Sequence, residues 1–216
     1  MSLQLYTFFR SSTSYRLRIA LAHKGLAYVP HYVSLPKMEH KAAEFTRLNP
    51  QGLVPALVDE AGRVFTQSLA MIEYLDETHP EPPLVPKDAE ARWYVRAASQ
   101  IIGCEMHPLN NVRVLKYLKA SYGLDDEKVN KGWYAHWVAE GFKGLEAFLA
   151  GQRRTGRFCL GDMFTMADVC LVPQVFNAER FGCDLAPYPL VMKLYAACQE
   201  LPAVKAAHPS TQADAF

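Results

Sequence analysis

Four prolines crowd the segment between residues 80 and 86, and they divide the chain into two parts: Pro80, Pro82, Pro83 and Pro86. Proline has a fixed backbone angle and no N–H to donate, so neither a regular helix nor a central strand is expected to cross this segment. Such a stretch is typical of a stiff linker between domains. We therefore expect a first domain of residues 1–79, a linker of residues 80–87 and a second domain of residues 88–216.

The first part carries alternating apolar patterns that predict strands, separated by segments of helical period. The short strands at 56–58 and 64–66 are joined by a glycine-containing loop of hairpin length. Expected strands cover residues 3–8, 28–33, 56–58 and 64–66. The first expected helix begins after residue 11 and ends near residue 24, the second covers residues 39–48, and the third begins at residue 68. The order βαβαββα predicts a mixed sheet with helices packed on it.

The second part shows helical periodicity and no convincing strand, which makes the chain an α+β protein with an all-helical second domain. Expected helices cover residues 89–122, 125–149, 165–180 and 190–200, with a shorter one near residue 203. Pro108 lies inside the first of these segments. A proline there removes a backbone donor, so we expect a bent helix whose neighbouring side chains line a cavity.

The overall composition excludes several classes of function. The charges nearly cancel, with 23 Lys and Arg against 22 Asp and Glu, and no basic stripe carries interleaved aromatic residues, so nucleic acid is not expected as a partner. No apolar run is long enough to span a bilayer, and the first residues lack a basic region followed by an apolar one, so a secretory leader is not expected. Its five cysteines are odd in number and widely spaced, which argues against disulfides and a zinc site. We expect a cytosolic protein without bound metal.

The turn after the first strand combines Arg10 with a row of hydroxyl residues, Ser11, Ser12 and Thr13. Because this turn opens a helix, its backbone N–H groups and the helix dipole favour an anion, and the hydroxyls offer donors to a phosphate, an oxyanion or a thiolate. Ser and Thr are also ordinary N-caps. By itself the turn therefore fits either an anion site or a simple cap.

Two further turns are of a similar kind. Val54 and Pro55 lie where a loop enters a strand, and proline cannot donate to the ladder, so the backbone of Val54 can pair with another partner. Gln67 and Ser68 place an amide and a hydroxyl at the start of a helix, which suits a carboxylate. Each is also an ordinary turn or cap, but together the three fit a peptide-like ligand with a carboxylate and a soft anion.

Several motifs resemble the zeta class of glutathione transferases, the maleylacetoacetate isomerases. The first half contains Ser-Ser-x-Ser-(aromatic)-Arg-x-Arg-Ile-Ala-Leu from residue 11, Asn-Pro-x-x-x-Val-Pro-x-Leu from residue 49 and Gln-Ser-x-Ala-x-Ile-Glu-Tyr-Leu from residue 67. The second half contains Gly-Asp-x-x-Thr-Met-Ala-Asp from residue 161, Leu-Val-Pro-Gln from residue 171 and Asn-Ala-Glu-Arg-Phe from residue 177. The resemblance implies a thioredoxin-like first domain, a helical second domain, a homodimer, glutathione as cofactor and a dicarboxylate substrate. Thr165 and Asp168 also have the spacing of a capping box, which starts a helix.

The resemblance implies a role for individual residues around glutathione. The turn at Ser11, Ser12 and Thr13 matches the one that holds the sulfur, although Thr13 stands where the class often has Cys. This departure argues against a protein thiol in the mechanism. The remaining positions that the resemblance assigns to glutathione are His40, Gln51, Val54, Pro55, Gln67, Ser68, Glu105 and His107, with Glu105 expected to act across the dimer.

The resemblance also implies cationic residues for the substrate carboxylates and for the enolate that develops during reaction. Arg10 and Arg180 match basic positions of the family's substrate pocket, and Asn111 and Arg113 are further candidates. The expected reaction is the isomerisation of maleylacetoacetate to fumarylacetoacetate in the catabolism of Tyr and Phe. Three alternatives stay open: maleylpyruvate isomerisation, a general transferase acting on electrophiles such as α-haloacids, and a non-catalytic interaction module of the same fold.

Overall fold

Strand β1 (Leu3–Thr7) is an inner strand of a four-stranded sheet with the order β2-β1-β3-β4. It pairs in parallel with β2 (Tyr28–Tyr32) and antiparallel with β3 (Ala56–Val58), which in turn pairs antiparallel with β4 (Val64–Phe65). Helix α1 (Ser12–His23) makes the crossover that a parallel pair requires. The expected βαβαββα order and mixed sheet are confirmed.

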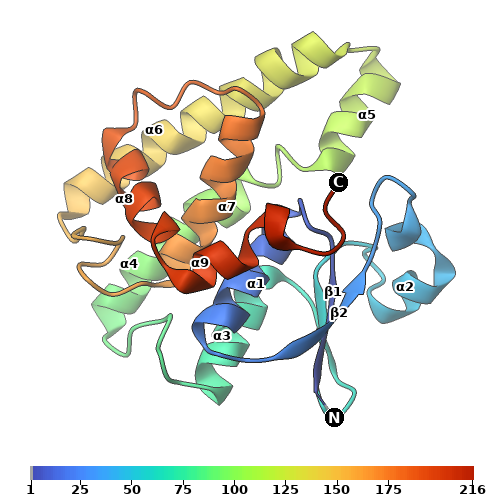
Figure 1. The fold of residues 1–216 in the computed structure, drawn as a ribbon. Helices are drawn as coiled ribbons and strands as arrows, with labels where there is room; N and C mark the ends of the chain where they lie inside the picture. Colours follow the sequence, from blue (N-terminus) through green and yellow to red (C-terminus); the bar gives the residue numbers. More distant parts are fainter. Residues whose placement is uncertain (1) are drawn as a thin grey trace. The chain divides into compact units, whose positions relative to one another are not determined.

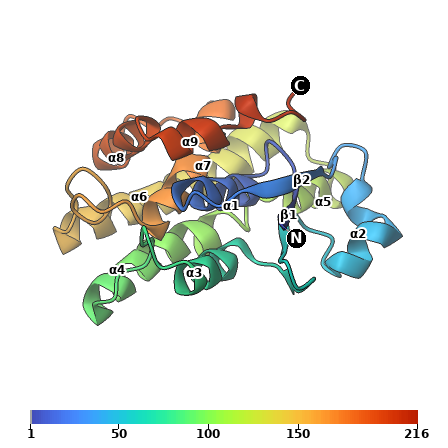
Figure 2. The ribbon, with the colours of Figure 1, turned by 60° about the horizontal axis from the view of Figure 1, so that its bottom comes forward.

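The computed structural model describes residues 2–216, which form two compact units. The first unit comprises residues 1–84 together with 200–216, and the second comprises residues 85–199. Residues 200–216 were expected in the second domain, but they pack on the first. The reason lies in α9 (Pro202–Ala207), which runs against α1 (Figures 1 and 2). The buried Tyr15 hydroxyl donates to the Val204 carbonyl at 3.4 Å.

Alternation along β1 provides two apolar faces. Leu5 is fully buried, whereas the next residue, Tyr6, packs against a separate apolar cluster that includes Phe8, Phe9 and Phe45; on the first unit's helical side, α1 contacts α3 (Ser68–Thr78). Helix α2 (Ala43–Leu48) closes that second face with Phe45, and Figure 1 shows α2 on the opposite side of the sheet from α1 and α3. The expected helix 39–48 is split, because Ala42 is extended between a 3₁₀ turn at Glu39–Lys41 and α2.

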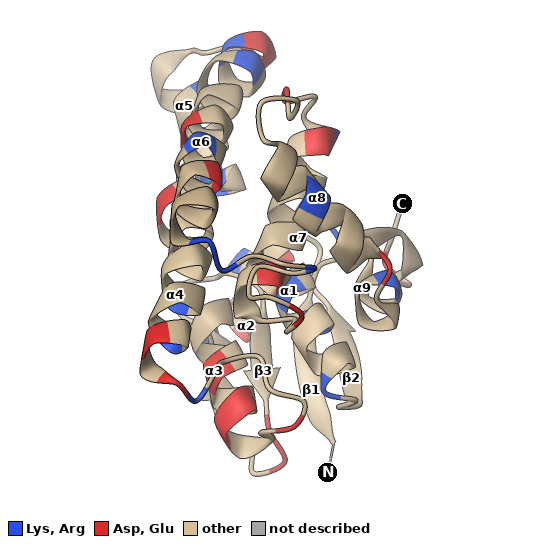
Figure 3. Cartoon of the chain, turned by 90° about the vertical axis from the view of Figure 1, so that its left-hand side faces the viewer, with Lys and Arg blue, Asp and Glu red and all other residues tan. Residues whose placement is uncertain are grey.

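The second unit is mainly helical, as expected, and it also contains π-helical turns at Ile101–Met106 and Lys128–Tyr134. Its helices are α4 (Ala89–Gln100), α5 (Val112–Tyr122), α6 (Ala135–Gln152), α7 (Met166–Arg180) and α8 (Pro189–Gln199). Most of α7 is buried, and α4 and α8 pack on it. Acidic and basic residues are interspersed along α4 and α6, whereas the charged residues of α5 are all basic (Figure 3).

One helix prediction in this unit was wrong. Residues 89–122 do not form one bent helix, because α4 continues into a π-helical turn at Ile101–Met106 and then stops. Pro108 lies in the turn that follows, where the Asn110 N–H donates to the His107 carbonyl at 3.2 Å. The side chain of Asn111 then caps the start of α5. An X-Pro sequence followed by an Asn cap favours a break and a new helix over a kink.

The capping box at the start of α7 is confirmed. The Asp168 carboxylate accepts hydrogen bonds from the Thr165 N–H and hydroxyl at 2.8 and 2.9 Å and from the Cys159 N–H at 2.8 Å. Burial raises the pKa of Asp168, and these hydrogen bonds act in the opposite direction. The carboxylate therefore joins the loop before α7 to the helix itself.

Residues 2–216 also bear on membrane spans, metal sites and disulfides. No helix there has both the length and the apolar character to cross a membrane. No group of three or more His, Cys, Asp or Glu side chains in that range could hold a metal ion. The five cysteines are free thiols, and three of them are buried.

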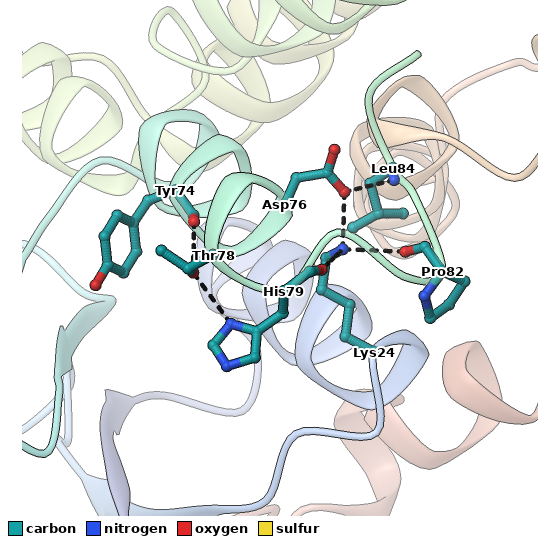
Figure 4. A network of polar contacts seen from close by, with 7 residues as sticks. All are labelled: Lys24, Tyr74, Asp76, Thr78, His79, Pro82 and Leu84. Atoms are coloured by element: carbon teal, nitrogen blue, oxygen red, sulfur yellow. Dashed lines mark hydrogen bonds and ion pairs between the residues drawn. The ribbon is translucent and has the colours of Figure 1, made fainter. Parts of the chain in front are cut away.

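A buried lysine joins the end of α1 to the proline-rich segment (Figure 4). The Lys24 ammonium, whose side chain is 0% exposed, donates to the Asp76 carboxylate at 2.7 Å and to the carbonyls of His79 and Pro82 at 2.8 and 3.0 Å. Asp76 in turn accepts the Leu84 N–H at 2.7 Å. All three ammonium protons thus have acceptors, which offsets the cost of burying the charge.

We expect Lys24→Met to destabilise the protein by about 3–5 kcal/mol, because it removes the ammonium that a mostly buried carboxylate and two carbonyls share. Urea unfolding measures the change in the free energy of unfolding. Lys37→Met, at an exposed lysine of the same unit, is the matched control and should change stability by less than about 0.5 kcal/mol. Equal effects in the two variants would contradict a structural role for the Lys24 network.

Candidate functional site

The hydroxyl-rich turn forms as the sequence predicts. Ser11 is the N-cap of α1: its side-chain oxygen accepts the Ser14 N–H at 3.2 Å, and its own N–H donates to the Phe8 carbonyl at 3.0 Å. Ser12 is the first residue of the helix and is buried. The turn thus places hydroxyls at a helix N-terminus, where the dipole favours a negative group.

Thr13 does more than occupy the position of a cysteine. Its hydroxyl donates to the Val54 carbonyl at 3.0 Å and lies 2.9 Å from the Ser11 hydroxyl. Since the Thr13 proton is used on Val54, Ser11 is the donor between the two hydroxyls. This chain of hydrogen bonds joins the start of α1 to the Val54–Pro55 loop, whose peptide bond is cis. Sequence reasoning placed both turns in one site but did not find this link.

The turn at Gln67 and Ser68 contacts the loop that precedes Val54. The Gln67 side-chain amide donates to the Gln51 side-chain oxygen at 2.7 Å, in an exposed hydrogen bond. Gln67 has φ +68°, a conformation that non-glycine residues rarely adopt. Such strain costs about 1–3 kcal/mol and is found most often at functional sites. The buried Ser68 follows it as the first residue of α3.

A close backbone approach shapes the loop that carries Gln51. Gly52 has φ +59°, and a Cβ at this position would lie 2.7 Å from the His40 carbonyl oxygen. The Lys41 ammonium donates to the Gln51 carbonyl at 3.2 Å, and Asn49 donates to the Leu53 carbonyl at 2.6 Å. The buried His40 and the exposed Gln51 therefore belong to neighbouring segments, as the assignment of both to one end of a ligand requires.

Arg10 lies in the turn directly before the N-cap and is half-buried. Its guanidinium carbon lies 4.9 Å from the ring centre of Phe9 and 4.9 Å from that of Phe216. Sequence reasoning found the arginine but missed Phe216, because the two lie at opposite ends of the chain. No local pattern indicated the contact.

The other predicted residues belong to the second unit. Glu105 is exposed in the π-helical turn after α4, and His107 and Asn111 are half-buried in the turn that leads to α5. The Asn111 side-chain oxygen accepts the Arg113 N–H at 3.1 Å, so Asn111 acts as a helix cap. Arg113 is exposed, and no ion pair of its guanidinium occurs within residues 2–216.

Arg180 is supported by an aromatic stack. Its guanidinium carbon lies 4.5 Å from the ring centre of Phe181, which stacks on Tyr134 with centroids 3.8 Å apart. The Asn110 amide donates to the Tyr134 carbonyl at 3.2 Å. The turn that holds Asn111 is thereby joined to the end of α7. Burial raises the pKa of Tyr134, so this phenol stays neutral near neutral pH.

Tyr134 was missed by the sequence analysis, and only its aromatic character in an expected helix could have drawn attention to it. Burial also raises the pKa of the neighbouring Cys183 thiol. The phenol and the thiol near Arg180 are therefore both neutral, and neither adds a negative charge that would compete with an anionic ligand.

Family comparisons agree with this geometry. The model of the glutathione S-transferase N-terminal domain matches residues 10–78, and the model of the C-terminal domain matches residues 131–206. A maleylpyruvate isomerase from Ralstonia is 49% identical over 98% of this chain and 99% of its own length. A probable maleylacetoacetate isomerase from Vibrio cholerae is 46% identical over 100% of this chain and 99% of its own length.

Solved structures give the same result. A holo maleylpyruvate isomerase, described as a bacterial glutathione S-transferase in the zeta class, has a TM-score of 0.95 at 48% identity and covers 99% of this chain and 100% of its own. This chain belongs to the zeta class of glutathione transferases. A maleylacetoacetate isomerase from Anaeromyxobacter dehalogenans has a TM-score of 0.87 at 37% identity, covering 100% of this transferase and 94% of its own chain. That structure holds dicarboxyethyl glutathione and citrate in its active site.

We expect Gly52→Ala to weaken glutathione binding and to destabilise the transferase, because the new Cβ would clash with the His40 carbonyl and move the loop of Gln51. Gly62→Ala is a matched control: Gly62 also has a positive φ, +78°, but nothing lies within 4 Å of the point that its Cβ would occupy. The control should therefore lose only the conformational cost of about 1–2 kcal/mol. Calorimetric titration with glutathione and urea unfolding measure both effects, and the proposed role of Gly52 is wrong if the two variants behave alike.

Proposed function

We propose that this zeta-class transferase is a glutathione-dependent cis–trans isomerase that converts maleylacetoacetate to fumarylacetoacetate in the catabolism of Tyr and Phe. The observation that carries the proposal is the hydrogen-bonded chain from Ser11 through Thr13 to the Val54 carbonyl. It joins a helix N-terminus that suits a thiolate to a loop that suits the backbone of a peptide. A tripeptide with a reactive thiol needs these two features side by side.

The residues of the first unit fit glutathione. The exposed Gln51–Gln67 amide pair and Ser68 at the start of α3 suit carboxylates, because amides and helix N-termini donate hydrogen bonds to anions. The strained backbone of Gln67 lowers the stability of the fold, and such strain is found where a residue is held in position to bind a ligand. We assign the γ-glutamyl carboxylate to Gln67 and Ser68, the cysteinyl backbone to Val54 and Pro55, and the glycyl end to His40 and Gln51. Glu105 and His107 are further candidates for contacts with glutathione.

When bound, glutathione supplies a thiolate that adds reversibly to the cis double bond, leaving a single bond that rotates before elimination restores the double bond and the thiolate. The chain's own task is to hold the sulfur as an anion, which the N-terminus of α1 and the hydroxyl of Ser12 do by favouring negative charge. Thr13 keeps the turn in register with the Val54 loop. No protein thiol takes part.

The substrate is a dicarboxylate whose charge rises on the enolate oxygen as the thiolate adds, so the chain must provide cations. Arg10 stands next to the sulfur turn and is suited to the developing enolate, since a group that meets charge only in the transition state accelerates the reaction. Arg180 is suited to a carboxylate of the substrate, with Asn111 and Arg113 as supporting positions. The dicarboxyethyl glutathione and citrate held by the Anaeromyxobacter relative are consistent with an anionic substrate next to the sulfur.

Maleylpyruvate is the second candidate substrate, and the 49% identity with the Ralstonia maleylpyruvate isomerase favours it. The two acids share the cis double bond, so the same residues serve both. A general transferase would need no arginine pair, and a non-catalytic module would not need the polar groups of the sulfur turn.

We further propose that the protein works as a homodimer in the cytosol. Free thiols at all five cysteines suit a reducing compartment, where glutathione is abundant. Trp93 on α4 is 51% exposed and offers apolar surface to a second copy.

Ser12→Ala should raise the pKa of bound glutathione and lower kcat more than Thr13→Ala does, because Ser12 is assigned to the thiolate whereas Thr13 donates to Val54. Thr13→Ala should mainly weaken glutathione binding. Thiolate absorbance against pH measures the pKa, and titration measures the affinity. An unchanged thiol pKa in Ser12→Ala with a large rise in Thr13→Ala would reverse the assignment.

The parent enzyme should isomerise maleylacetoacetate or maleylpyruvate only when glutathione is added, and assaying both acids decides between the two substrates. Removing a charge-assisted hydrogen bond of about 1.5–3 kcal/mol should lower kcat/KM by about one to two orders of magnitude. We expect Arg180→Ala to act mainly through KM and Arg10→Ala through both constants.

Activity toward a neutral chloronitroarene serves as the control and should survive in both arginine variants. Parental kinetics of both variants on both acids would refute the arginine assignment and favour the general transferase.

A further inference from the structure

The segment of residues 209–216 lies against the turn that carries Arg10, although it is far from that turn in the sequence. The Asp214 carboxylate accepts the Phe9 N–H at 3.0 Å, and the ring of Phe216 lies 5.0 Å from the ring of Phe9 at an interplanar angle of 64°. Both interactions reach the residue directly before Arg10. The aromatic sequence Phe8-Phe9 alone gives no reason for a partner from this segment.

The Arg10 guanidinium lies between aromatic rings. Its central carbon is 4.9 Å from the ring centres of both Phe9 and Phe216, and 6.0 Å from that of Phe8. A cation at this distance from a ring is attracted by the electron density of its face. Phe9 is buried and fixed, whereas Phe216 is 80% exposed. Phe216 therefore contributes little to the core, and its ring acts at this turn through its contacts with Phe9 and with the cation.

The backbone of Phe9, directly before Arg10, is held by Asp214 and by Arg18 of α1. Arg18 donates to the Phe9 carbonyl at 2.9 Å and to the Ala207 carbonyl at 3.1 Å. With the Asp214 bond to the Phe9 N–H, both polar backbone groups of the residue before Arg10 are satisfied. Asp214 also acts electrostatically on Arg18, whose pKa burial lowers to about 10 and which stays charged near neutral pH.

We propose that Asp214 and Phe216 are positioning residues for Arg10: Asp214 fixes the backbone from which the side chain starts, and Phe216 holds the guanidinium at its far end. A long side chain that is confined in this way loses less entropy when it binds an anion. The consequence for the enzyme rests on the proposed function, in which Arg10 meets the substrate. The placement of the Arg10 side chain by Phe216 does not depend on that function.

The experiment is a double-mutant cycle between Arg10→Ala and Phe216→Ala, measured as kcat and KM with the maleyl acid that the parent enzyme turns over. Because an exposed cation–π contact is weak, Phe216→Ala should lower kcat/KM by about 2- to 5-fold in the parent background. In the Arg10→Ala background it should cause no further loss. Phe216→Tyr should keep the parental value, and Ala213→Ser, at an exposed position of the same segment, is the control.

Asp214→Ala, which removes the acceptor of the Phe9 N–H, should act in the same direction and also lose its effect in the Arg10→Ala background. A second measurement follows the Arg10 Nε–H resonance by NMR, assigned by its disappearance in Arg10→Ala. It should shift in Phe216→Ala and stay in place in Ala213→Ser. Glutathione affinity should be the same in Phe216→Ala and the parent.

The outcomes separate this inference from the proposed function. An equal loss from Phe216→Ala in both backgrounds, or an unmoved Arg10 resonance, overturns the positioning role while the proposed function stands. The other outcome has two parts: Phe216→Ala shifts the Arg10 resonance, but Arg10→Ala keeps the kinetics of the parent enzyme. It refutes the catalytic use of Arg10, and with it the enzymatic part of this inference.

Discussion

The buried guanidinium of Arg18 is the interaction on which the first unit depends. It is 1% exposed, yet each of its nitrogens has an acceptor: the carbonyls of Phe8, Phe9 and Ala207 and the hydroxyl of Thr7. Burying a charge without such partners would cost several kcal/mol. Because the acceptors come from the end of β1 and the end of α9, Arg18 fixes both to α1.

Helix α1 therefore carries structure and chemistry on one short element. Its first turn presents Ser11, Ser12 and Thr13, and further along the helix Arg18 holds the backbone that leads into that first turn. The positions of these hydroxyls are well defined, because Arg18 fixes the end of the strand that precedes them. Thr13 extends this rigidity to the Val54 loop, so a threonine at this position has a structural role of its own that a cysteine could not fill with the same donor strength.

Both units use buried polar groups in the same manner. Asp168 in the second unit and Lys24 in the first are each surrounded by backbone partners from a neighbouring loop. In each case a charged side chain supplies hydrogen bonds to the backbone of a loop. These bonds fix a loop that has few backbone hydrogen bonds of its own. Arg10 and Arg180 differ, because aromatic rings support their charges, and a ring face attracts a cation without needing an N–H donor aimed at an oxygen.

The sequence by itself determined the strand and helix order of the first unit, the capping box at Thr165 and Asp168, and the three polar turns, because each depends on residues within a few positions of one another. Local patterns also predicted a linker at residues 80–87, since prolines act through their own backbone. The break at Pro108 was read as a bend, because a periodic pattern does not reveal that Asn111 begins a second helix. Only the tertiary structure decided that residues 200–216 join the first unit, that Thr13 donates to Val54, and that Phe216 meets Arg10. These contacts join segments that are far apart in the chain, and their partners are backbone carbonyls and ring faces, which leave no mark in the order of the residues.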